Sequence, residues 1–424
     1  MLINNFENLN AVPRPSKKEE RVVEFIKNFG LNLGLSTYVD SCGNVIIKKP
    51  ASEGMESRKT IIIQSHLDMV HQKNADKEFD FFNQGIQSYI DGDWVTADGT
   101  TLGADNGMGV ATIMTLLASD DIDHPALEAL FTIDEETGMT GAMGLQAGYL
   151  NGEILLNLDT EEDDEIDIGC AGGIDISAQN PYNAVSTPTN SVGFTIAVTG
   201  LNGGHSGMDI HKGLGNANKI MNRLLHGSQE FVRVSEINGG SLRNAIPRES
   251  KAIVAIDMVQ EDAFKYEMGL QIEAIQSELK TLEPDLIVVL TKIDAPKVIM
   301  DLGVQEGLTR AIYAAWNGVY RMSPDIPELV ETSNNIARVV IKEGNVKIGC
   351  LTRSSVESSK MDLAMMLRAT FELIGCEVEL SGDYPGWAPD MDSSILKVLR
   401  SLYEKLNNEK PHVAACHAGL ECGI

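Results

Sequence analysis

The segment TIIIQSHLD at residues 60–68 decides the fold of the first part of the chain. Its apolar run does not alternate with polar residues, which is typical of a strand buried on both faces of a parallel sheet. Two similar runs follow, LEALFTI at residues 127–133 and EILLNL at residues 153–158. A helical apolar pattern lies between the first two runs, at residues 107–118. This alternation predicts an open, mostly parallel α/β sheet with helices on both faces.

The flanking segments complete the predicted organisation. Ser16-Lys17-Lys18-Glu19 has the pattern of a capping box before a helix. From about residue 176 the strands alternate polar and apolar residues, and long amphipathic helices separate them, which predicts an inserted α+β lid domain. The predicted strands are residues 192–199, 251–258, 335–341 and 346–351, the last two joined by a hairpin turn. We therefore expect a catalytic domain in residues 1–175, the insert in 176–384, and the returning, apparently truncated part of the catalytic domain in 385–424.

Composition excludes several classes of protein. The net charge of −27 opposes binding to nucleic acid and to anionic membrane surfaces. No apolar run reaches the length of a membrane span, and the N-terminus lacks the features of a secretory signal. The six cysteines form no CxxC pair and no disulfide-like spacing, so we expect reduced thiols and a cytoplasmic protein.

Acidic residues and a histidine follow the ends of all three buried strands. His66 and Asp68 follow the first strand, residues 134–136 the second, and Asp159 the third, while Asp105 stands at a tight turn before a helix. Ligands of open α/β sheets bind beyond the carboxyl ends of the strands. A solvated loop would explain any one of these residues, but their convergence on one edge favours a common site.

A metal ion is the simplest occupant of such a site. Clustered carboxylates repel one another unless they bind a cation or protons. One imidazole with several carboxylates suits Zn²⁺, with Mn²⁺ or Co²⁺ as substitutes. Asp68 is two residues from His66, so it could accept the second imidazole N–H and orient the ring. Glu135 and Glu136 point differently, so one could bind metal while the other transfers protons.

Several motifs, in this order, resemble those of the aminoacyl-histidine (Xaa-His) dipeptidases. That branch belongs to the di-zinc exopeptidase family that also includes carnosinases, peptidase T and acetylornithine deacetylase. The motifs are SHLDMV, GTTLGADNGMG, DEETGMTGA, LNLDTEE, GCAGGID, GLNGGHSGMDIHKGLGNANK, GGSLRNAIPRE and CHAGLECG. The resemblance covers nearly the whole chain and implies zinc-dependent hydrolysis of dipeptides with C-terminal His. The alternatives are an N-acyl amino acid deacylase of the same family and a non-catalytic metal- or peptide-binding relative.

The resemblance also implies roles for single residues of the metal centre. His66 and Asp159 would hold one zinc, Asp105 would bridge two zincs, and Glu136 would hold the second. Asp68 would orient His66. Glu135 would be the general base for attack by a metal-bridging hydroxide, and the Asp105–Asn106 peptide bond would be cis.

Further roles fall outside the metal ligands. His205 matches a lid histidine that reaches the partner subunit's active site, which implies a homodimer. Asn244 and Arg353 match substrate-binding positions, and His417 and Gly419 would line the pocket from the returning part of the sheet domain. The family's second zinc takes a further His beyond the last motif, and this sequence ends at Ile424. For residues 1–424 we therefore expect about one tightly held zinc, unless His417 completes the site.

Overall fold

The computed structural model describes residues 1–424, which divide into two compact units. Unit 1 comprises Met1–Ile166, Asp392–Val413 and Ile424, and unit 2 comprises Asp167–Met391 and Ala414–Gly423. Two of the boundaries fall within paired strands, β8 (Glu165–Cys170) and β22 (His412–Cys416). Of residues 385–424, predicted to be the returning part of the sheet domain, only 392–413 and Ile424 belong to unit 1, whereas 385–391 and 414–423 group with unit 2.

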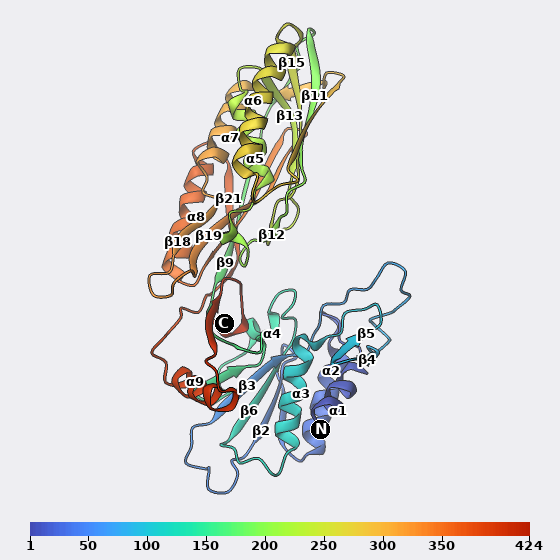
Figure 1. The fold of residues 1–424 in the computed structure, drawn as a ribbon, viewed down its shortest axis with the longest axis vertical. Coiled ribbons are helices and arrows are strands. Elements are labelled where there is room, and N and C mark those ends of the chain that lie inside the picture. Colours follow the sequence, from blue (N-terminus) through green and yellow to red (C-terminus); the bar gives the residue numbers. More distant parts are fainter. The chain divides into compact units, whose positions relative to one another are not determined.

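Unit 1 is built on a five-stranded sheet in the order β1-β2-β6-β3-β7. Strand β3 pairs in parallel with both β6 and β7, while β2 pairs antiparallel with β1 and β6, so β2 alone runs against the other four. The sheet is therefore mostly parallel, as predicted (Figure 1). Its strands are β1 (Ser36–Val39), β2 (Val45–Lys49), β3 (Ile61–His66), β6 (Leu127–Thr132) and β7 (Ile154–Asn157).

The two faces of this sheet carry separate apolar cores. Buried side chains of β2, β3 and β6 pack with three helices on one face, and the other face packs against residues 145–150. The helices of the first face are α1 (Leu2–Asn10), α2 (Glu20–Asn32) and α3 (Ala104–Ala118). The remaining elements of unit 1 are the hairpin β4 (Ser88–Asp91) and β5 (Trp94–Ala97), and the helices α4 (Thr140–Gly144) and α9 (Ser394–Asn407).

The predicted capping box before α2 is wrong. The helix begins at Glu20, and its N-cap residue Glu19 makes no side-chain capping bond. Ser16 instead donates its hydroxyl to the backbone carbonyl of Met69 at 3.3 Å, and a carboxylate oxygen of Glu19 accepts the backbone N–H of Lys17 at 2.8 Å. Contacts with a distant segment override the local pattern here.

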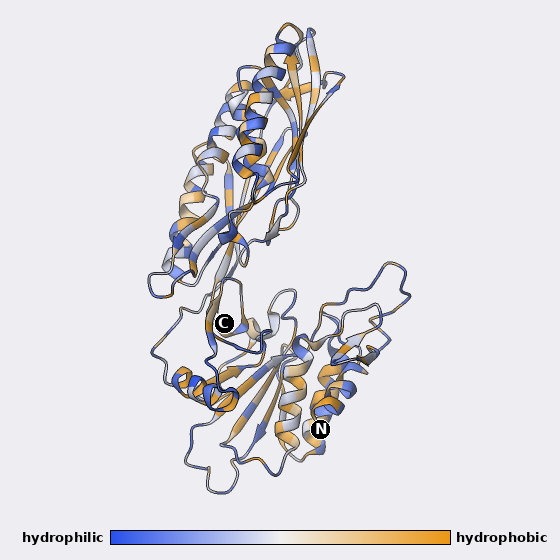
Figure 2. Ribbon diagram, in the orientation of Figure 1, coloured by the Kyte–Doolittle hydropathy of each residue, from blue (hydrophilic) through white to orange (hydrophobic).

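Unit 2 contains a nine-stranded antiparallel sheet in the order β16-β11-β15-β13-β19-β20-β9-β21, with β18 paired to β19. Four helices lie along one face of this sheet (Figure 1) and present both hydrophilic and hydrophobic sides (Figure 2). The helices are α5 (Ala217–Gly227), α6 (Glu261–Leu279), α7 (Leu302–Ala314) and α8 (Glu357–Glu372). The strands are β9 (Gly172–Pro181), β11 (Ser191–Thr199), β13 (Val232–Gly239), β15 (Ser250–Asp257), β16 (Ile287–Ile293), β18 (Gly318–Met322), β19 (Val330–Lys342), β20 (Asn345–Ser354) and β21 (Glu377–Tyr384).

The smaller elements of unit 2 agree with the predicted α+β insert. Lys342 pairs with Asn345, so Glu343 and Gly344 form a two-residue hairpin turn, and both have positive φ as such a turn requires. Two short ladders accompany the sheet, β10 (Ala184–Ser186) with β17 (Val298–Met300) and β12 (Gly204–His205) with β14 (Ala245–Ile246). The predicted fold class is thus confirmed. None of the helices has the length and apolarity needed to cross a membrane.

Candidate metal centre

The carboxyl ends of β3, β6 and β7 bring together most of the residues proposed as metal ligands. His66 ends β3, and its Nε2 lies 3.0 Å from Oδ1 of Asp105 and 3.4 Å from Oδ1 of Asp159. The potential ligand atoms of His66, Asp105 and Glu136 all lie within 4.8 Å of one another. One imidazole and three carboxylates therefore meet at this edge, a donor set that fits a zinc-like cation.

Asp68 lies behind the imidazole ring of His66. Its Oδ1 is 3.3 Å from His66 Nδ1, and the side chain is fully buried. The same carboxylate accepts the backbone N–H of Glu135 at 3.0 Å and that of Glu136 at 3.3 Å. Burial alone would raise the pKa of Asp68, but the hydrogen bonds from His66, Ser16 and Glu135 lower it overall, so the carboxylate stays ionised. This geometry is the one needed to fix the ring of a ligating histidine.

The sequence analysis overlooked Asn106 as a site residue. Its amide nitrogen donates to Oδ1 of Asp159, and its amide oxygen accepts the hydroxyl of Ser65 at 2.8 Å. The Asp105–Asn106 peptide bond is cis, as the resemblance implied. Asn106 therefore connects β3, the turn before α3 and the segment after β7. Its place directly after Asp105 was the only signal in the sequence.

The close packing of these groups shifts the pKa values of His66 and Glu136. Burial would lower the pKa of His66, but hydrogen bonds to Asp105, Asp159 and Asp68 outweigh it and raise the pKa well above its usual range. Burial and the charge of Asp105 raise the pKa of Glu136. Both shifts arise because carboxylates with few cationic partners are gathered around one imidazole.

The three acids after β6 have different environments. The Asp134 carboxylate accepts hydrogen bonds from Thr137, from Thr140 at 2.7 Å and from Lys17 Nζ at 3.0 Å, so it stabilises its own turn. Glu136 accepts the backbone N–H of Val70 at 3.2 Å. Glu135 is half-buried beside Glu136. Glu135 and Glu136 thus remain the candidates for the roles that the resemblance implies.

A second group of predicted residues comes together in unit 2. The Nδ1 atom of His205 accepts the backbone N–H groups of Gly207 at 3.2 Å and Met208 at 3.1 Å. The ring proton of neutral His205 must therefore be on Nε2, which can donate to a ligand. Burial, and next the charge of Arg353, lower the pKa of His205.

Arg353 and His417 lie beside His205 in this group. Arg353 is 5% exposed, and its Nη1 donates to the Tyr384 hydroxyl at 2.8 Å. His417 Nε2 is 2.8 Å from the Ser333 hydroxyl, and burial followed by the charge of Arg353 lowers the pKa of His417 to about 3. A Cβ atom at Gly207 would lie 2.0 Å from the carbonyl oxygen of His417, so only glycine permits this approach.

Asn244 and Gly419, the other two predicted pocket residues, are connected to this group through the backbone. Asn244 is exposed, and its backbone carbonyl oxygen accepts the backbone N–H of Ser206 at 2.7 Å, next to His205. Gly419 lies two residues beyond His417 in the same segment. Tyr384 and Ser333 complete the group, and the sequence pattern gave no indication of either.

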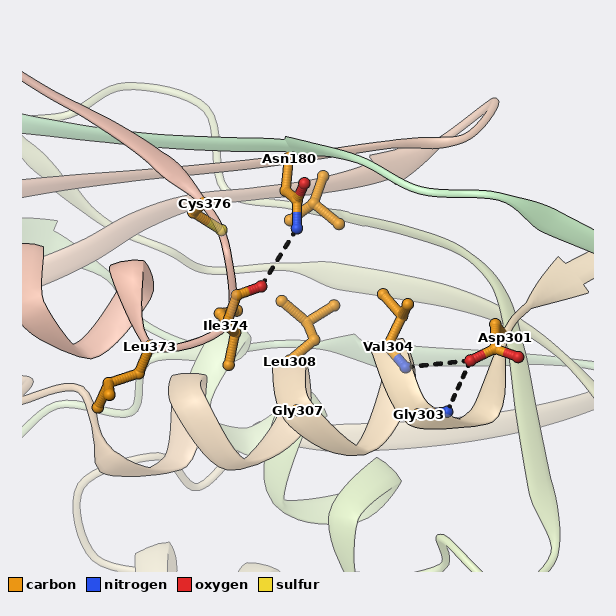
Figure 3. A pocket seen from close by; sticks show the side chains of 10 residues that line it. Asn180, Asp301, Gly303, Val304, Gly307, Leu308, Leu373, Ile374 and Cys376 are labelled. Carbon is orange, nitrogen blue, oxygen red and sulfur yellow. Dashed lines mark hydrogen bonds between the residues drawn. The ribbon is translucent and has the colours of Figure 1, made fainter.

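A hollow of 450 Å³ elsewhere in unit 2 lacks comparable chemistry (Figure 3). Most of its lining is apolar, from α7 and the end of α8. Asp301 is its only acid, and the Asp301 carboxylate accepts the backbone N–H of Gly303 at 2.9 Å as the N-cap of α7. Asn180 donates to the carbonyl oxygen of Ile374 at 3.2 Å. The polar groups of this hollow are thus occupied by structural hydrogen bonds.

Comparisons with known proteins agree with this arrangement. A family model described as the peptidase dimerisation domain matches residues 196–283. The chain is 42% identical over 421 residues to the cytosol non-specific dipeptidase of Escherichia coli (strain K12), covering 99% of this chain and 87% of that protein.

Solved structures show the same relationship. The aminoacylhistidine dipeptidase from Vibrio alginolyticus matches with a TM-score of 0.91 and 44% identity, covering 100% of this chain and 86% of that one. The aminopeptidase PepT from Bacillus cereus ATCC 10987 matches with a TM-score of 0.54 and 16% identity, covering 100% and 86%. The second likeness concerns the fold alone.

Proposed function

Since this chain belongs to the M20 family of peptidases and is a peptide hydrolase, we propose that it cleaves unblocked dipeptides, with those ending in His as the preferred class. The observation that carries the proposal is the group of His66, Asp105, Asp159 and Glu136 with Asp68 behind the imidazole. The substrate class rests on the name of the similar Vibrio alginolyticus enzyme.

We propose unit 1 as the catalytic domain and its carboxylate edge as a zinc site, for which Mn²⁺ or Co²⁺ could substitute. The complete site would hold two ions, and residues 1–424 alone would hold about one tightly. His66 and Asp159 would hold one ion, Glu136 the other, and Asp105 both. Bound metal would polarise the scissile carbonyl and make a water molecule more acidic at neutral pH. Asp68 would hold the His66 ring in the orientation and tautomer that ligation needs.

The remaining steps belong to side chains of the protein. Glu135 would take the proton of the attacking water and deliver it to the departing amine. Nε2–H of His205 would donate to the oxygen of the carbonyl as negative charge develops there. Arg353 would bind the terminal carboxylate of the dipeptide through its planar guanidinium, with Asn244, His417 and Gly419 lining the pocket.

We further propose a homodimer in the cytoplasm. The match to a dimerisation domain lies within unit 2, which would act as the lid and the dimer contact. His205 would act in the active site of the partner subunit. None of the six cysteines is in a disulfide, and the similar Escherichia coli enzyme is cytosolic by name, which supports a reducing compartment.

A substrate panel tests this proposal. Metal-loaded protein is incubated with Xaa-His dipeptides, other dipeptides and N-acetylated amino acids, each with and without a chelator. We expect hydrolysis of dipeptides, fastest for Xaa-His, and its loss with the chelator. Preference for the acetylated amino acids would instead identify a deacylase, and turnover of neither class by metal-loaded protein would refute hydrolysis at this site.

A further inference from the structure

Arg14 is a buried cation next to the candidate metal centre. It lies between α1 and α2 and is only 2% exposed. Arginine is almost never buried so completely unless its charge and donors are paired. Arg14 has no role in the proposed hydrolysis, so the reason for its burial lies in the groups that its guanidinium contacts.

The guanidinium of Arg14 connects the two segments that carry His66 and Asp105. Its Nη1 donates to the carbonyl oxygens of Leu67 and Asp68, both at 3.1 Å, directly after His66. Its Nη2 donates to the carbonyl oxygen of Gly103, two residues before Asp105. A single side chain thus holds the end of β3 and the turn before α3.

The same guanidinium is tied to the end of α1. Nη2 also donates to the side-chain oxygen of Asn10 at 3.3 Å, and the amide of Asn10 donates to the carbonyl oxygen of Leu102 at 3.2 Å. Asn10 is 1% exposed. The guanidinium is therefore held in place by Asn10 at the end of α1, while it binds the end of β3 and the turn before α3.

Two glycines leave room for this side chain. A Cβ atom at Gly103 would lie 2.5 Å from Nη2 of Arg14, and one at Gly107 would lie 2.7 Å from it. Gly103 also has a φ of +71°, which favours glycine. The ADNG turn that presents Asp105 is thus shaped around the guanidinium.

Arg14 is a cation at neutral pH. Burial lowers the pKa of its guanidinium to about 10, while the charges of Asp68, Asp105 and Glu136 act in the opposite direction. The side chain therefore offers both a positive charge and a set of directed donors. These two properties predict opposite effects on metal binding, because a fixed positive charge repels a cation whereas fixed ligand geometry favours its binding.

We propose that Arg14 is a positioning residue of the metal centre, and that its hydrogen bonds hold His66 and Asp105 at the spacing that metal binding requires. The proposal rests on the function proposed above. Geometry outweighs charge here because the guanidinium donates to the backbone of both ligand segments, and a shift of either segment would separate the ligand atoms.

Metal affinity of two variants separates the two effects. Arg14→Lys keeps the charge but loses the forked donors, and Arg14→Gln loses both. We expect each to weaken zinc affinity about 10–100-fold, the range found for residues that support metal ligands. Affinity is measured by competition of metal-free protein with a chromogenic zinc chelator. Unchanged affinity in Arg14→Lys together with tighter binding in Arg14→Gln would overturn the proposal.

Arg338 offers a matched control. It is half-buried in unit 2, where its Nη1 donates to the carbonyl oxygens of Gly239, at 3.0 Å, and Gly240. Arg338→Lys and Arg338→Gln remove similar hydrogen bonds from a guanidinium to backbone carbonyl oxygens. Because these bonds do not involve the segments that carry metal ligands, we expect the variants to have a lower melting temperature but a zinc affinity within about threefold of wild type. If the Arg14 variants and the Arg338 variants lose zinc affinity equally, Arg14 only stabilises the fold in general, and the proposal is contradicted.

A milder variant guards against misfolding of the Arg14 variants. Asn10→Ala removes one partner of the guanidinium, and we expect it to fold and to bind zinc several-fold more weakly. Wild-type affinity in this variant would contradict the proposal. The measured quantity is zinc affinity, so the test does not depend on the substrate. If the wild-type protein binds zinc but cleaves no dipeptide, the proposed function is refuted, and the zinc affinities of the variants can still be compared.

Discussion

Replacement of Asp68 by Asn tests the support of the metal centre. The buried carboxylate faces three donors: His66 Nδ1 at 3.3 Å, and the backbone N–H groups of Glu135 at 3.0 Å and Glu136 at 3.3 Å. Asn keeps one acceptor oxygen and turns the other into a donor, so at least one buried N–H loses its partner. One such loss costs about 1–3 kcal/mol of folding stability.

The larger effect is expected on metal binding. Without the carboxylate, His66 Nδ1 keeps only the backbone carbonyl oxygen of Asp68, at 3.2 Å, so the ring is held less firmly. Loss of such a partner typically weakens metal affinity or activity about 10–100-fold. Zinc affinity is measured by chelator competition, and the free energy of unfolding by urea titration monitored by circular dichroism. We expect both to fall.

Asp40→Asn is the matched control for this change. Asp40 is 7% exposed in unit 1, and its Oδ1 accepts the backbone N–H groups of Cys42, Gly43 and Asn44, each at 2.9 Å. Its replacement should cost comparable stability without changing zinc affinity. If Asp68→Asn loses stability but binds zinc as wild type does, the assignment of Asp68 as the residue that orients His66 is refuted.

Three further variants test the roles of single side chains. Glu135→Gln should retain zinc and lose about 10²–10⁴-fold in turnover, since it removes the general base; near-normal turnover of the zinc-loaded variant would contradict this. An equimolar mixture of His205→Ala and Glu135→Gln chains should regain about a quarter of wild-type activity after subunit exchange, because half the dimers are hybrid and each hybrid has one complete site; no regain after proven exchange would exclude action across subunits. Burial, and next the charge of Arg353, lower the pKa of His417 to about 3 in the folded protein, from about 6.5 in the unfolded chain. Below pH 6.5 the unfolded chain therefore binds a proton that the folded protein does not, and the free energy of unfolding falls by about 1.4 kcal/mol per pH unit. His417→Gln should flatten the dependence of unfolding free energy on pH between 6.5 and 4, and an unchanged slope in urea titrations would rule out this origin.

The arrangement of the sheet could be predicted because it depends on local patterns. The apolar runs of β3 and β6 indicate buried strands, as the structure shows. The predicted burial of β7 on both faces is wrong, because β7 is the edge strand of the sheet and its side chains are exposed or only partly buried. All three strands are parallel and end at the same edge of the sheet. That rule accounts for the proximity of His66 and Asp159, whereas Asp105 lies in the turn before α3 and joins them at the same edge. The spacing of His66 and Asp68 likewise predicted their contact, which the structure shows.

Contacts between distant segments could not be predicted from local patterns. The residues around Arg14 form no recognisable motif, and its proposed positioning role depends on hydrogen bonds to carbonyl groups 53 to 89 residues away. Asn106 likewise depends on Ser65 and Asp159. The supposed capping box failed for the same reason, because Ser16 binds Met69 rather than the start of the helix. In each case the backbone group that decides the structure belongs to another element.

Zinc titration of metal-free protein, with hydrolysis of an Xaa-His dipeptide followed on the same samples, tests whether hydrolysis depends on metal bound at the carboxyl ends of β3, β6 and β7. We expect no hydrolysis without metal and a rise in turnover that follows zinc bound at the group of His66, Asp105, Asp159 and Glu136, with both lost in a His66→Ala variant. Hydrolysis by the metal-free protein, or undiminished zinc binding and turnover in His66→Ala, would contradict this dependence.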